Sequence, residues 1–310
     1  MIEIIGINSY IAIKDKLMKN IFWLPSYPKS GNTWLRLILC GLFFTKDGRI
    51  NNFDILKKIP GHDSLKNFEF VKEVNLQDYN IIFKNTEYDE SSILAYSKYW
   101  IETQKRTKIK NGSFAFFKTH NARVKIKDNY YTDTSTTAGF IYIFRDPRDI
   151  AISYSKHINK ELTETINILF NGQIVEKDKI NNKMPEILLN WKDHYLSWKK
   201  FSTEVPSLFI KYEDLLEDAE KEINKVINFL SLNYNLEIEN KKEKIKNIIE
   251  TTSFNNLTKI EKKYGFYEKS NNSVFFRKGN KNQWIDSLLK EQCIEIEQRF
   301  FNEMKELKYI

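Results

Sequence analysis

A lysine and a glycine near the start of the sequence lie between two apolar stretches, in a pattern that suits the binding of an anion. Lys29 and Gly31 belong to the run Tyr-Pro-Lys-Ser-Gly-Asn-Thr-Trp at 27–34. The apolar run at 20–25 before it and the Leu-Arg-Leu-Ile-Leu run at 35–39 after it predict a strand, a tight loop and a helix. A helix that begins directly after such a loop points unpaired backbone N–H groups and the positive end of its dipole at the loop. With the charge of Lys29, this arrangement predicts a phosphate-binding site.

A second basic cluster follows another short apolar run. Residues 139–144 are β-branched and aromatic and too few for a helix, so they predict a strand that ends at Arg145. The run Arg-Asp-Pro-Arg-Asp that begins there fits a helix start, because proline is tolerated in a first turn and Asp146 or Asp149 can accept from its N–H groups. Ser153 follows Arg145 by eight residues, about two helical turns. The pattern predicts a second oxyanion site, although a turn held by local ion pairs is the alternative for this segment alone.

A lysine and a histidine follow a third apolar run. Residues 113–117 predict a buried strand, and Lys118 and His120 come at its carboxyl end. Because ligands gather at the carboxyl ends of strands in open parallel sheets, we expect these side chains to converge with the two basic clusters in one crevice. A histidine titrates near neutral pH, so His120 suits a general base. A lone histidine is more often structural, and the helix-borne His157 is the alternative base.

A third basic segment lies near the carboxyl end of the chain. Phe276 is followed by Arg277, Lys278 and Gly279, and Trp284 comes five residues later. Two cations and a glycine suit a loop that closes over a phosphate, since glycine lets the backbone come close. A basic loop without a ligand is the alternative for this segment taken alone.

Taken in their order, these segments resemble the sulfotransferases that use 3′-phosphoadenosine 5′-phosphosulfate (PAPS). The run at 27–34 resembles the 5′-phosphosulfate loop of that family, and the pair Arg145 and Ser153 resembles its 3′-phosphate motif. The Lys-Thr-His segment at 118–120 and the Arg-Lys-Gly segment at 277–279 also match the family. The family continues the last segment with two residues and Gly-Asp-Trp, whereas this chain has Asn-Lys-Asn-Gln-Trp, which leaves the closure of that loop open.

Two further segments resemble parts of the family that lie beside the nucleotide. The run at 207–214 carries Tyr212 near its end, and the Thr-Thr-Ser-Phe run at 251–254 carries Ser253. An aromatic residue at a strand end is usually core packing, but the order of these segments along the chain agrees with the family. We expect Tyr212 and Ser253 to border the nucleotide, with Trp34 as an aromatic residue facing the adenine.

The resemblance implies an α/β fold, a single P-loop-like domain over residues 1–310 with a central parallel β-sheet flanked by helices and helical insertions covering the acceptor site. It implies in-line transfer of a sulfonate from PAPS to a hydroxyl or an amine of an unidentified acceptor, without a metal. In the family pattern His120 is the general base and Lys118 faces the transferred sulfonate, and Lys29 joins them as a catalytic residue that neutralises charge from the phosphate loop. The positions that match cofactor contacts of the family are Lys29, Ser30, Gly31, Asn32, Thr33, Trp34, Arg145, Ser153, Tyr212, Ser253, Arg277, Lys278 and Gly279.

Two other functions are alternatives. A small-molecule kinase would use ATP and Mg²⁺, but the phosphate loop of nucleoside triphosphatases has its lysine after the last glycine, whereas Lys29 precedes Gly31. A catalytically idle protein that binds the desulfonated nucleotide 3′-phosphoadenosine 5′-phosphate (PAP) is the second alternative. The presence of Lys118, His120 and Arg145 in the expected segments argues for an active enzyme instead.

Composition limits the class of protein. The 310 residues, 41% of them hydrophobic, are enough for a substantial core, and no stretch approaches the roughly 18 uninterrupted apolar residues of a membrane span. The first residues lack the pattern of a secretory leader, and the two cysteines suit a reducing compartment, so we expect a cytoplasmic location. The net charge of +8 would attract a polyanionic cofactor. Because lysine is interleaved with glutamate, as on solvated helices, no nucleic-acid partner is expected.

The expected partner is therefore the acceptor, a small molecule, a saccharide or a lipid with a hydroxyl group. The short dimer-forming motif of the family is absent, which leaves a homodimer open.

The remaining segments predict architecture. The segments patterned as amphipathic helices are 215–231, 236–250 and 286–307. An aromatic stripe at helical spacing, which we expect to be core, is formed by Trp191, His194, Tyr195 and Trp198. We expect a polar loop at 125–138, an irregular acceptor-side wall at 48–112, and a helical cover of the site at 159–184.

Overall fold

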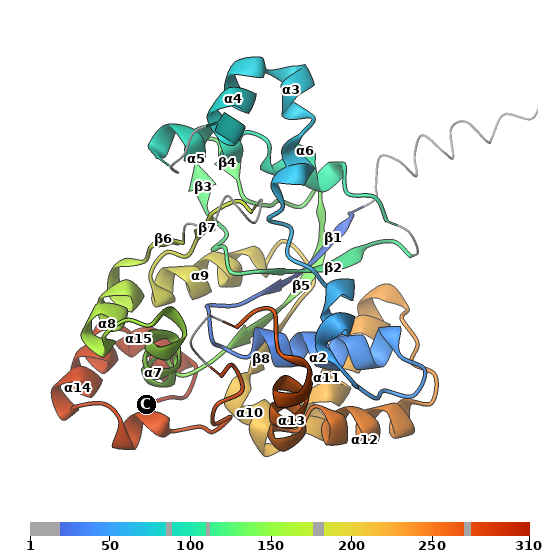
Figure 1. Ribbon diagram of the computed structural model, residues 1–310, viewed down its shortest axis with the longest axis vertical. Helices are drawn as coiled ribbons and strands as arrows, with labels where there is room; N and C mark the ends of the chain where they lie inside the picture. The colour runs from blue at the N-terminus through green and yellow to red at the C-terminus, as the bar shows by residue number, and fades with distance from the viewer. Residues whose placement is uncertain (1–18, 85–88, 110–111, 176–182, 270–273) are drawn as a thin grey trace, which may run out of the picture.

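The central element of the computed structural model is a parallel β-sheet (Figure 1). The structure describes residues 19–84, 89–109, 112–175, 183–269 and 274–310, so the expectation about a leader falls outside the described residues. The strands of the sheet are β1 (Ile21–Pro25), β2 (Ala115–Thr119), β5 (Thr137–Phe144) and β8 (Ser207–Lys211). Their order is β2-β1-β5-β8, and each neighbouring pair is parallel. The predicted parallel sheet is confirmed.

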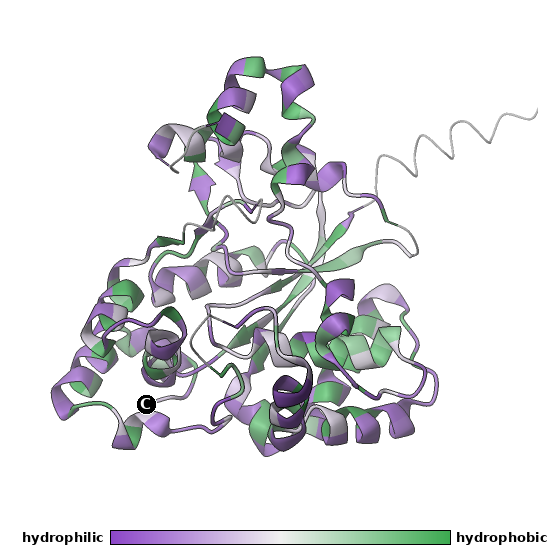
Figure 2. Ribbon diagram, in the orientation of Figure 1, coloured by the Kyte–Doolittle hydropathy of each residue, from purple (hydrophilic) through white to green (hydrophobic). Residues whose placement is uncertain are grey.

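Strand β1 divides its side chains between the two faces of the sheet, as alternation along a strand requires. Phe22 and Leu24 pack on one face with helices α2 (Asn32–Phe44), α11 (Ala219–Tyr234) and α12 (Lys241–Thr251). Ile21 and Trp23 pack on the other face with helix α9 (Trp191–Phe201). Figure 2 shows the apolar sheet at the centre and hydrophilic residues along the outer helices. Both faces are therefore covered, which is how parallel sheets are stabilised.

The aromatic stripe on α9 is core, as predicted. Tyr195 and Trp198 are buried against the sheet, and Trp191 is buried in a separate cluster. That cluster joins helices α7 (Pro147–Ile158), α8 (Leu162–Asn171), α14 (Lys290–Arg299) and α15 (Phe301–Glu306). It covers the part of the molecule next to the carboxyl end of β5 (Figure 1).

Several expected boundaries were wrong. The expected helix at 215–231 is two helices, α10 (Tyr212–Glu217) and α11, because Asp218 lies between them and caps α11 by accepting from Lys221 N. The expected helix at 286–307 is likewise divided into α14 and α15, at the buried Phe300. The expected polar loop at 125–138 contains a short hairpin of β3 (Lys125–Ile126) and β4 (Asn129–Tyr130).

Much of the segment 48–112 is helical and projects beyond one end of the sheet as a lobe (Figure 1). The segment begins with η1 (Phe53–Lys58), which packs against α2, and continues with η2 (Leu65–Phe68), α3 (Val71–Val74), α4 (Leu76–Lys84), α5 (Glu90–Ser97) and α6 (Trp100–Lys105). The segment 159–184 contains α8 and the short strand β6 (Ile174–Val175), while 176–182 lie outside the described residues. The other described elements are β7 (Glu186–Ile187), α13 (Phe254–Tyr264) and η4 (Gln283–Asp286). In the described part of the chain, no helix is both long and apolar enough to cross a membrane.

Candidate active site

All four strands of the sheet deliver predicted site residues to one cavity. Lys29 follows β1, His120 follows β2, Arg145 follows β5 and Tyr212 follows β8. All four line a cavity of about 430 Å³. Because the strands are parallel, their carboxyl ends lie at the same edge of the sheet. The expected convergence of the histidine with the two basic clusters is confirmed.

The loop between β1 and α2 presents an open helix N-terminus to this cavity. Lys29 and Gly31 both have left-handed backbone conformations, with φ of 67° and 103°. A Cβ atom on Gly31 would lie 2.6 Å from the ring of Tyr212, so only glycine fits. Helix α2 has no side-chain N-cap and no acidic residue in its first turn. Its first N–H groups are therefore available to an anion.

Four buried polar atoms in or beside this loop have no hydrogen-bond partner among the described residues. They are the Tyr27 hydroxyl, the Oγ of Ser30, the Oδ1 of Asn32 and the Nε of Arg145. Buried polar atoms in proteins are normally paired, and Arg145 lines the cavity, so its Nε–H is suited to an anionic ligand there. This fits the binding of a phosphorylated nucleotide.

The charge of Lys29 is destabilised in the absence of a ligand. Burial and the neighbouring Arg145 lower the pKa of Lys29 to about 8, and Glu268 only partly offsets them. The Nζ atom lies 3.9 Å from the centre of the Phe275 ring, a cation–π contact. A bound anion would stabilise the charged form.

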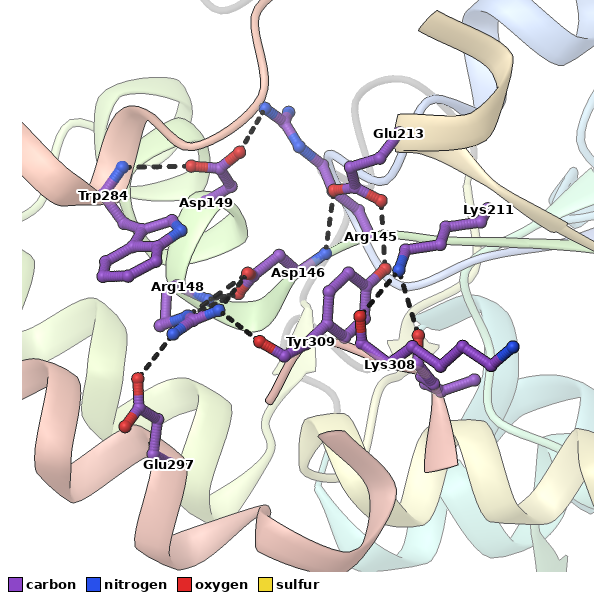
Figure 3. Close-up of polar contacts among 11 residues, drawn as sticks. Arg145, Asp146, Arg148, Asp149, Lys211, Glu213, Trp284, Glu297, Lys308 and Tyr309 are labelled. Atoms are coloured by element: carbon purple, nitrogen blue, oxygen red, sulfur yellow. Dashed lines mark hydrogen bonds and ion pairs between the residues drawn. The ribbon is translucent and has the colours of Figure 1, made fainter. Parts of the chain in front are cut away.

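Arg145 connects the start of α7, where Figure 3 draws its bond to Asp149, to the basic loop at the carboxyl end. Its Nη2 donates to Asp149 Oδ2 at 3.3 Å and to the carbonyl of Asn280 at 2.9 Å. Its guanidinium lies 4.4 Å from the centre of the Tyr212 ring. Ser153, on the same helix, also lines the cavity. Arginine and hydroxyl groups in this arrangement suit a second phosphate.

A buried network holds this end of α7 in place (Figure 3). Asp146 caps the helix by accepting from Arg148 N at 2.9 Å, as one of the two expected alternatives. Arg148 Nη2 also donates to Asp146 at 2.6 Å and to the carbonyl of Tyr309 at 3.1 Å. Glu213 accepts from Asp146 N at 3.2 Å and from the Tyr309 hydroxyl at 3.1 Å. The backbone that carries the Arg145 side chain is therefore held in place by β5, by Glu213 of α10 and by Tyr309 near the carboxyl end.

The hydrogen bonds of His120 determine which of its nitrogens carries the proton. Nδ1 lies 2.8 Å from the carbonyl oxygen of Ser26, which can only accept, so Nδ1 is the donor in the neutral ring. Nε2 then carries the lone pair that a general base requires. The backbone of His120 is also fixed, since its carbonyl accepts from His194 Nε2 at 3.2 Å. His194 is a structural histidine whose pKa burial lowers to about 3.

The alternative base His157 lies on α7, as expected, and also lines the cavity. Burial, followed by the charges of Lys29, His120 and Lys118, lowers its pKa to about 4. The ring of His157 meets that of Phe275 edge-on, at 6.2 Å between centres. It is a neutral wall residue of the cavity.

Trp34 and Tyr212 form an aromatic corner of the cavity. Their rings are 5.9 Å apart at 74°, and Trp34 Nε1 donates to Thr252 Oγ1 at 3.1 Å. Ser253 does not line the cavity: its hydroxyl donates to the carbonyl of Glu250 at 2.8 Å, and its neighbours Thr252 and Phe254 line the cavity instead. The buried Ser30 also lies behind the lining.

The Arg-Lys-Gly segment reaches the cavity as predicted. Arg277, Lys278 and Gly279 line it, and Arg277 Nη2 donates to Gln283 at 3.1 Å. Gly279 has φ of 63°, and a Cβ atom there would lie 2.2 Å from the Phe254 ring. Glycine is required at this position for both reasons.

Sequence reasoning missed Glu268, Phe275 and the role of Arg36. Glu268 accepts from Lys118 Nζ at 3.0 Å and from Arg36 Nη1 at 2.8 Å. A possible signal was Arg36 itself, the only charged residue in the otherwise apolar helix α2.

The described residues of the expected wall at 48–112 contribute none of the residues that line the large cavity. No group of three or more His, Cys, Asp or Glu side chains in the described ranges is placed to hold a metal ion.

The arrangement can hold two anionic groups at the ends of the neighbouring strands β1 and β5, with Lys118 and His120 at the end of β2, the strand on the other side of β1. Residues 19–308 match the model of the family described as sulfotransferase domain. An amine sulfotransferase of Oryctolagus cuniculus is 25% identical over 296 residues, which cover 92% of this chain and 81% of that protein. The cytosolic sulfotransferase 17 of Arabidopsis thaliana is 23% identical over 91% of this chain and 73% of its own length.

Solved structures share the fold. A mouse sulfotransferase in complex with PAP aligns with a TM-score of 0.54 and 20% identity, over 93% of this chain and 85% of its own. Retinol dehydratase in complex with androsterone and PAP aligns with a TM-score of 0.58 and 16% identity, over 96% of this chain and 86% of its own.

Proposed function

This chain belongs to the sulfotransferase domain family, and we propose that it transfers a sulfonate from PAPS to a hydroxyl of a small-molecule acceptor, with His120 as general base. The observation that carries the proposal is the convergence of Lys29, Arg145 and His120 on one cavity from three neighbouring strands. A single phosphate would need only one of the two cationic sites. A nucleotide with separate 5′ and 3′ groups uses both.

The residues present fit such a nucleotide. The 5′-phosphosulfate would lie on the loop at 29–34, where the first turn of α2 offers N–H donors and Lys29 offers a positive charge. The 3′-phosphate would lie against Arg145 and Ser153, with Arg277 and Lys278 from the carboxyl-terminal loop. The adenine would pack against the corner of Trp34 and Tyr212. Of the predicted contacts, Ser253 has the weakest support, because Thr252 and Phe254 line the cavity in its place.

The chemistry follows from charge and position. PAPS, when bound, supplies an activated sulfonate on a phosphate leaving group. Lys29 and Lys118 would neutralise the negative charge that develops on the leaving oxygen, which is the electrostatic part of catalysis. His120, with its proton on Nδ1, would accept the proton of the acceptor hydroxyl at Nε2. Holding the acceptor in line with the leaving group would supply the rest of the rate enhancement.

The acceptor is proposed from the relatives and from the cavity wall. The relatives include a flavonol 4′-sulfotransferase of Flaveria chlorifolia and the amine sulfotransferase named above, so both hydroxyl and amine acceptors occur among them. The cavity lining includes Tyr154, Val175 and Glu186, and Glu186 accepts from His120 N at 3.4 Å. A hydroxyl acceptor fits best, since a neutral hydroxyl is a weak nucleophile unless a base removes its proton, whereas a neutral amine can attack before it loses one.

The experiment that tests this function is calorimetric titration of the protein with PAP, 5′-AMP and ATP, each with and without Mg²⁺. We expect PAP to bind at micromolar or lower concentration, independently of Mg²⁺, and more tightly than 5′-AMP. Preference for ATP with Mg²⁺ would favour the kinase alternative. Transfer is then measured with radiolabelled PAPS and a panel of phenols, alcohols and amines. PAP binding without any transfer would favour the idle PAP-binding protein.

A further inference from the structure

We propose that Glu268 is a positioning residue that holds the ammonium of Lys118 at the transfer site, and that Arg36 anchors Glu268. The inference rests on the proposed function, because it takes Lys118 as the cation that faces the transferred group. The three residues come from three distant parts of the chain. Arg36 lies on α2, Lys118 is in β2, and Glu268 follows α13.

Arg36 is a rigid anchor for the carboxylate. Its side chain is only 1% exposed. Nε donates to the carbonyl of Ile59 at 3.0 Å, and Nη2 donates to the carbonyl of Leu56 at 3.2 Å. Nη1 donates to both oxygens of Glu268, at 2.8 and 3.0 Å. The guanidinium therefore has little freedom, and it fixes the carboxylate at two points.

Glu268, held in place by Arg36, in turn holds the ammonium group of Lys118. Its Oε1 accepts from Lys118 Nζ at 3.0 Å, and both side chains are largely buried, with 15% and 16% of their surfaces exposed. Although burial opposes ionisation, Lys118 and Arg36 lower the pKa of Glu268 to about 2. The carboxylate therefore stays charged at any pH at which the protein would be assayed.

The geometry suits catalysis as well as folding. Lysine has a flexible four-carbon side chain, so an ammonium without an anchor samples several rotamers. It has three N–H donors, and it can donate to Glu268 and to a bound sulfonate at the same time. Because Lys118 and Glu268 both line the cavity, the pair is in reach of a ligand there. A misplaced catalytic group loses rate while ground-state binding is retained.

The test is a double-mutant cycle with Glu268→Gln and Lys118→Met, read out as release of PAP from PAPS with 4-nitrophenol as acceptor and also with water. Glutamine keeps the size of the side chain but removes its charge. We expect Glu268→Gln to lower kcat at least about tenfold, while KM for PAPS and the Kd of PAP change less than about threefold. In the Lys118→Met background, Glu268→Gln should change kcat less than about twofold. Losses that simply multiply would overturn the proposal, because Glu268 would then act without Lys118.

Glu261 provides the matched control. This carboxylate anchors the same loop by accepting from the backbone N–H groups of Phe275 and Phe276, at 2.8 and 2.9 Å. Both of these described hydrogen bonds go to the loop backbone, so the effect of Glu261→Gln should be the same in the wild-type and Lys118→Met backgrounds. If both glutamate substitutions were equally non-additive with Lys118→Met, the effect of Glu268→Gln would come from loss of loop stability rather than from its bond to Lys118. That result would also overturn the proposal.

A folding failure leaves the proposal testable. If Glu268→Gln does not fold, Glu268→Asp keeps the charge that Arg36 needs but is one methylene shorter, and it should show the same loss confined to kcat. Failure of the underlying function has a different signature. In that case the wild-type protein would bind no PAP or release none from PAPS. Failure of this inference instead leaves an active wild-type protein, with a Glu268→Gln variant that is equally active or that loses rate without a specific coupling to Lys118.

Discussion

The guanidinium of Arg145 donates a hydrogen bond of 2.9 Å to the backbone carbonyl of Asn280. Asn280 is the first of the two unspecified residues that follow Arg-Lys-Gly in the family pattern, and this chain departs from that pattern at Asn282 and Gln283. A second bond secures the same loop, since Trp284 N donates to Asp149 Oδ1 at 3.1 Å (Figure 3). The altered loop therefore closes onto the arginine of the predicted 3′-phosphate site, and the missing Gly-Asp pair does not leave it detached.

Arg145→Ala should weaken PAP binding far more than 5′-AMP binding. A charged hydrogen bond to a phosphate is worth about 1.5–3 kcal/mol, so we expect the Kd of PAP to rise roughly 10- to 100-fold. The Kd of 5′-AMP, which has no 3′-phosphate, should rise less than about threefold. Calorimetry with both ligands measures the ratio, and Ser153→Ala should give a smaller change of the same kind. Equal losses for the two nucleotides would count against a 3′-phosphate site.

His120→Ala should remove most turnover and spare the cofactor. Loss of a general base typically costs about 10²–10⁴-fold in rate, and the ring of His120 is held by Ser26 in the orientation that a base needs. We expect the Kd of PAP to change less than about threefold. His157→Gln is the comparison, since His157 lines the same cavity. If the glutamine variant lost as much activity as His120→Ala, or if His120→Ala kept near-normal turnover, the assignment of the base would be wrong.

PAP affinity should fall as the pH rises above about 8. Burial and Arg145 lower the pKa of Lys29 to about 8 in the unliganded protein, and a phosphate binds the protonated amine. Above that pKa the protein must take up a proton to bind, so the Kd should rise by up to about tenfold per pH unit. Titrations between pH 6.5 and 9.5 give the slope. Lys29→Met should bind weakly with little pH dependence over this range, and an unchanged slope in this variant would rule out Lys29 as its source.

Gly31→Ala should destabilise the protein and abolish tight nucleotide binding. The residue has φ of 103°, and its new Cβ would lie 2.6 Å from the Tyr212 ring. Left-handed strain and overpacking together should cost about 2–4 kcal/mol in the free energy of unfolding. Gly265→Ala is the comparison for strain without a clash, since Gly265 has φ of 72° and ψ of 177°, a conformation essentially restricted to glycine, and nothing lies within 4 Å of a Cβ; it should cost about 1–3 kcal/mol without changing PAP binding. Denaturant unfolding and calorimetry compare them, and equal effects would mean that the contact with Tyr212 is unimportant.

The sequence by itself determined the local parts of the site. The strand-loop-helix order around Lys29, the helix start after Arg145 and the position of His120 after a strand all depend on neighbouring residues, whose φ preferences and hydrogen bonds act over a few positions. The parallel sheet followed from these units together with the family resemblance. Boundaries were less certain because they depend on single contacts, such as the cap at Asp218 that divides α10 from α11.

Only the tertiary structure decided which distant residues meet. The Lys118–Glu268 bond joins residues 150 positions apart, and the Arg36–Glu268 bond joins residues 232 positions apart. No local pattern marks Glu268, because an ion pair between distant segments depends on how helices and loops pack around the sheet. The same reason explains why Thr252 and Phe254 line the cavity where Ser253 was expected. Neighbouring residues at the start of a helix point in different directions, so the packing of the helix decides which side chains reach the cavity.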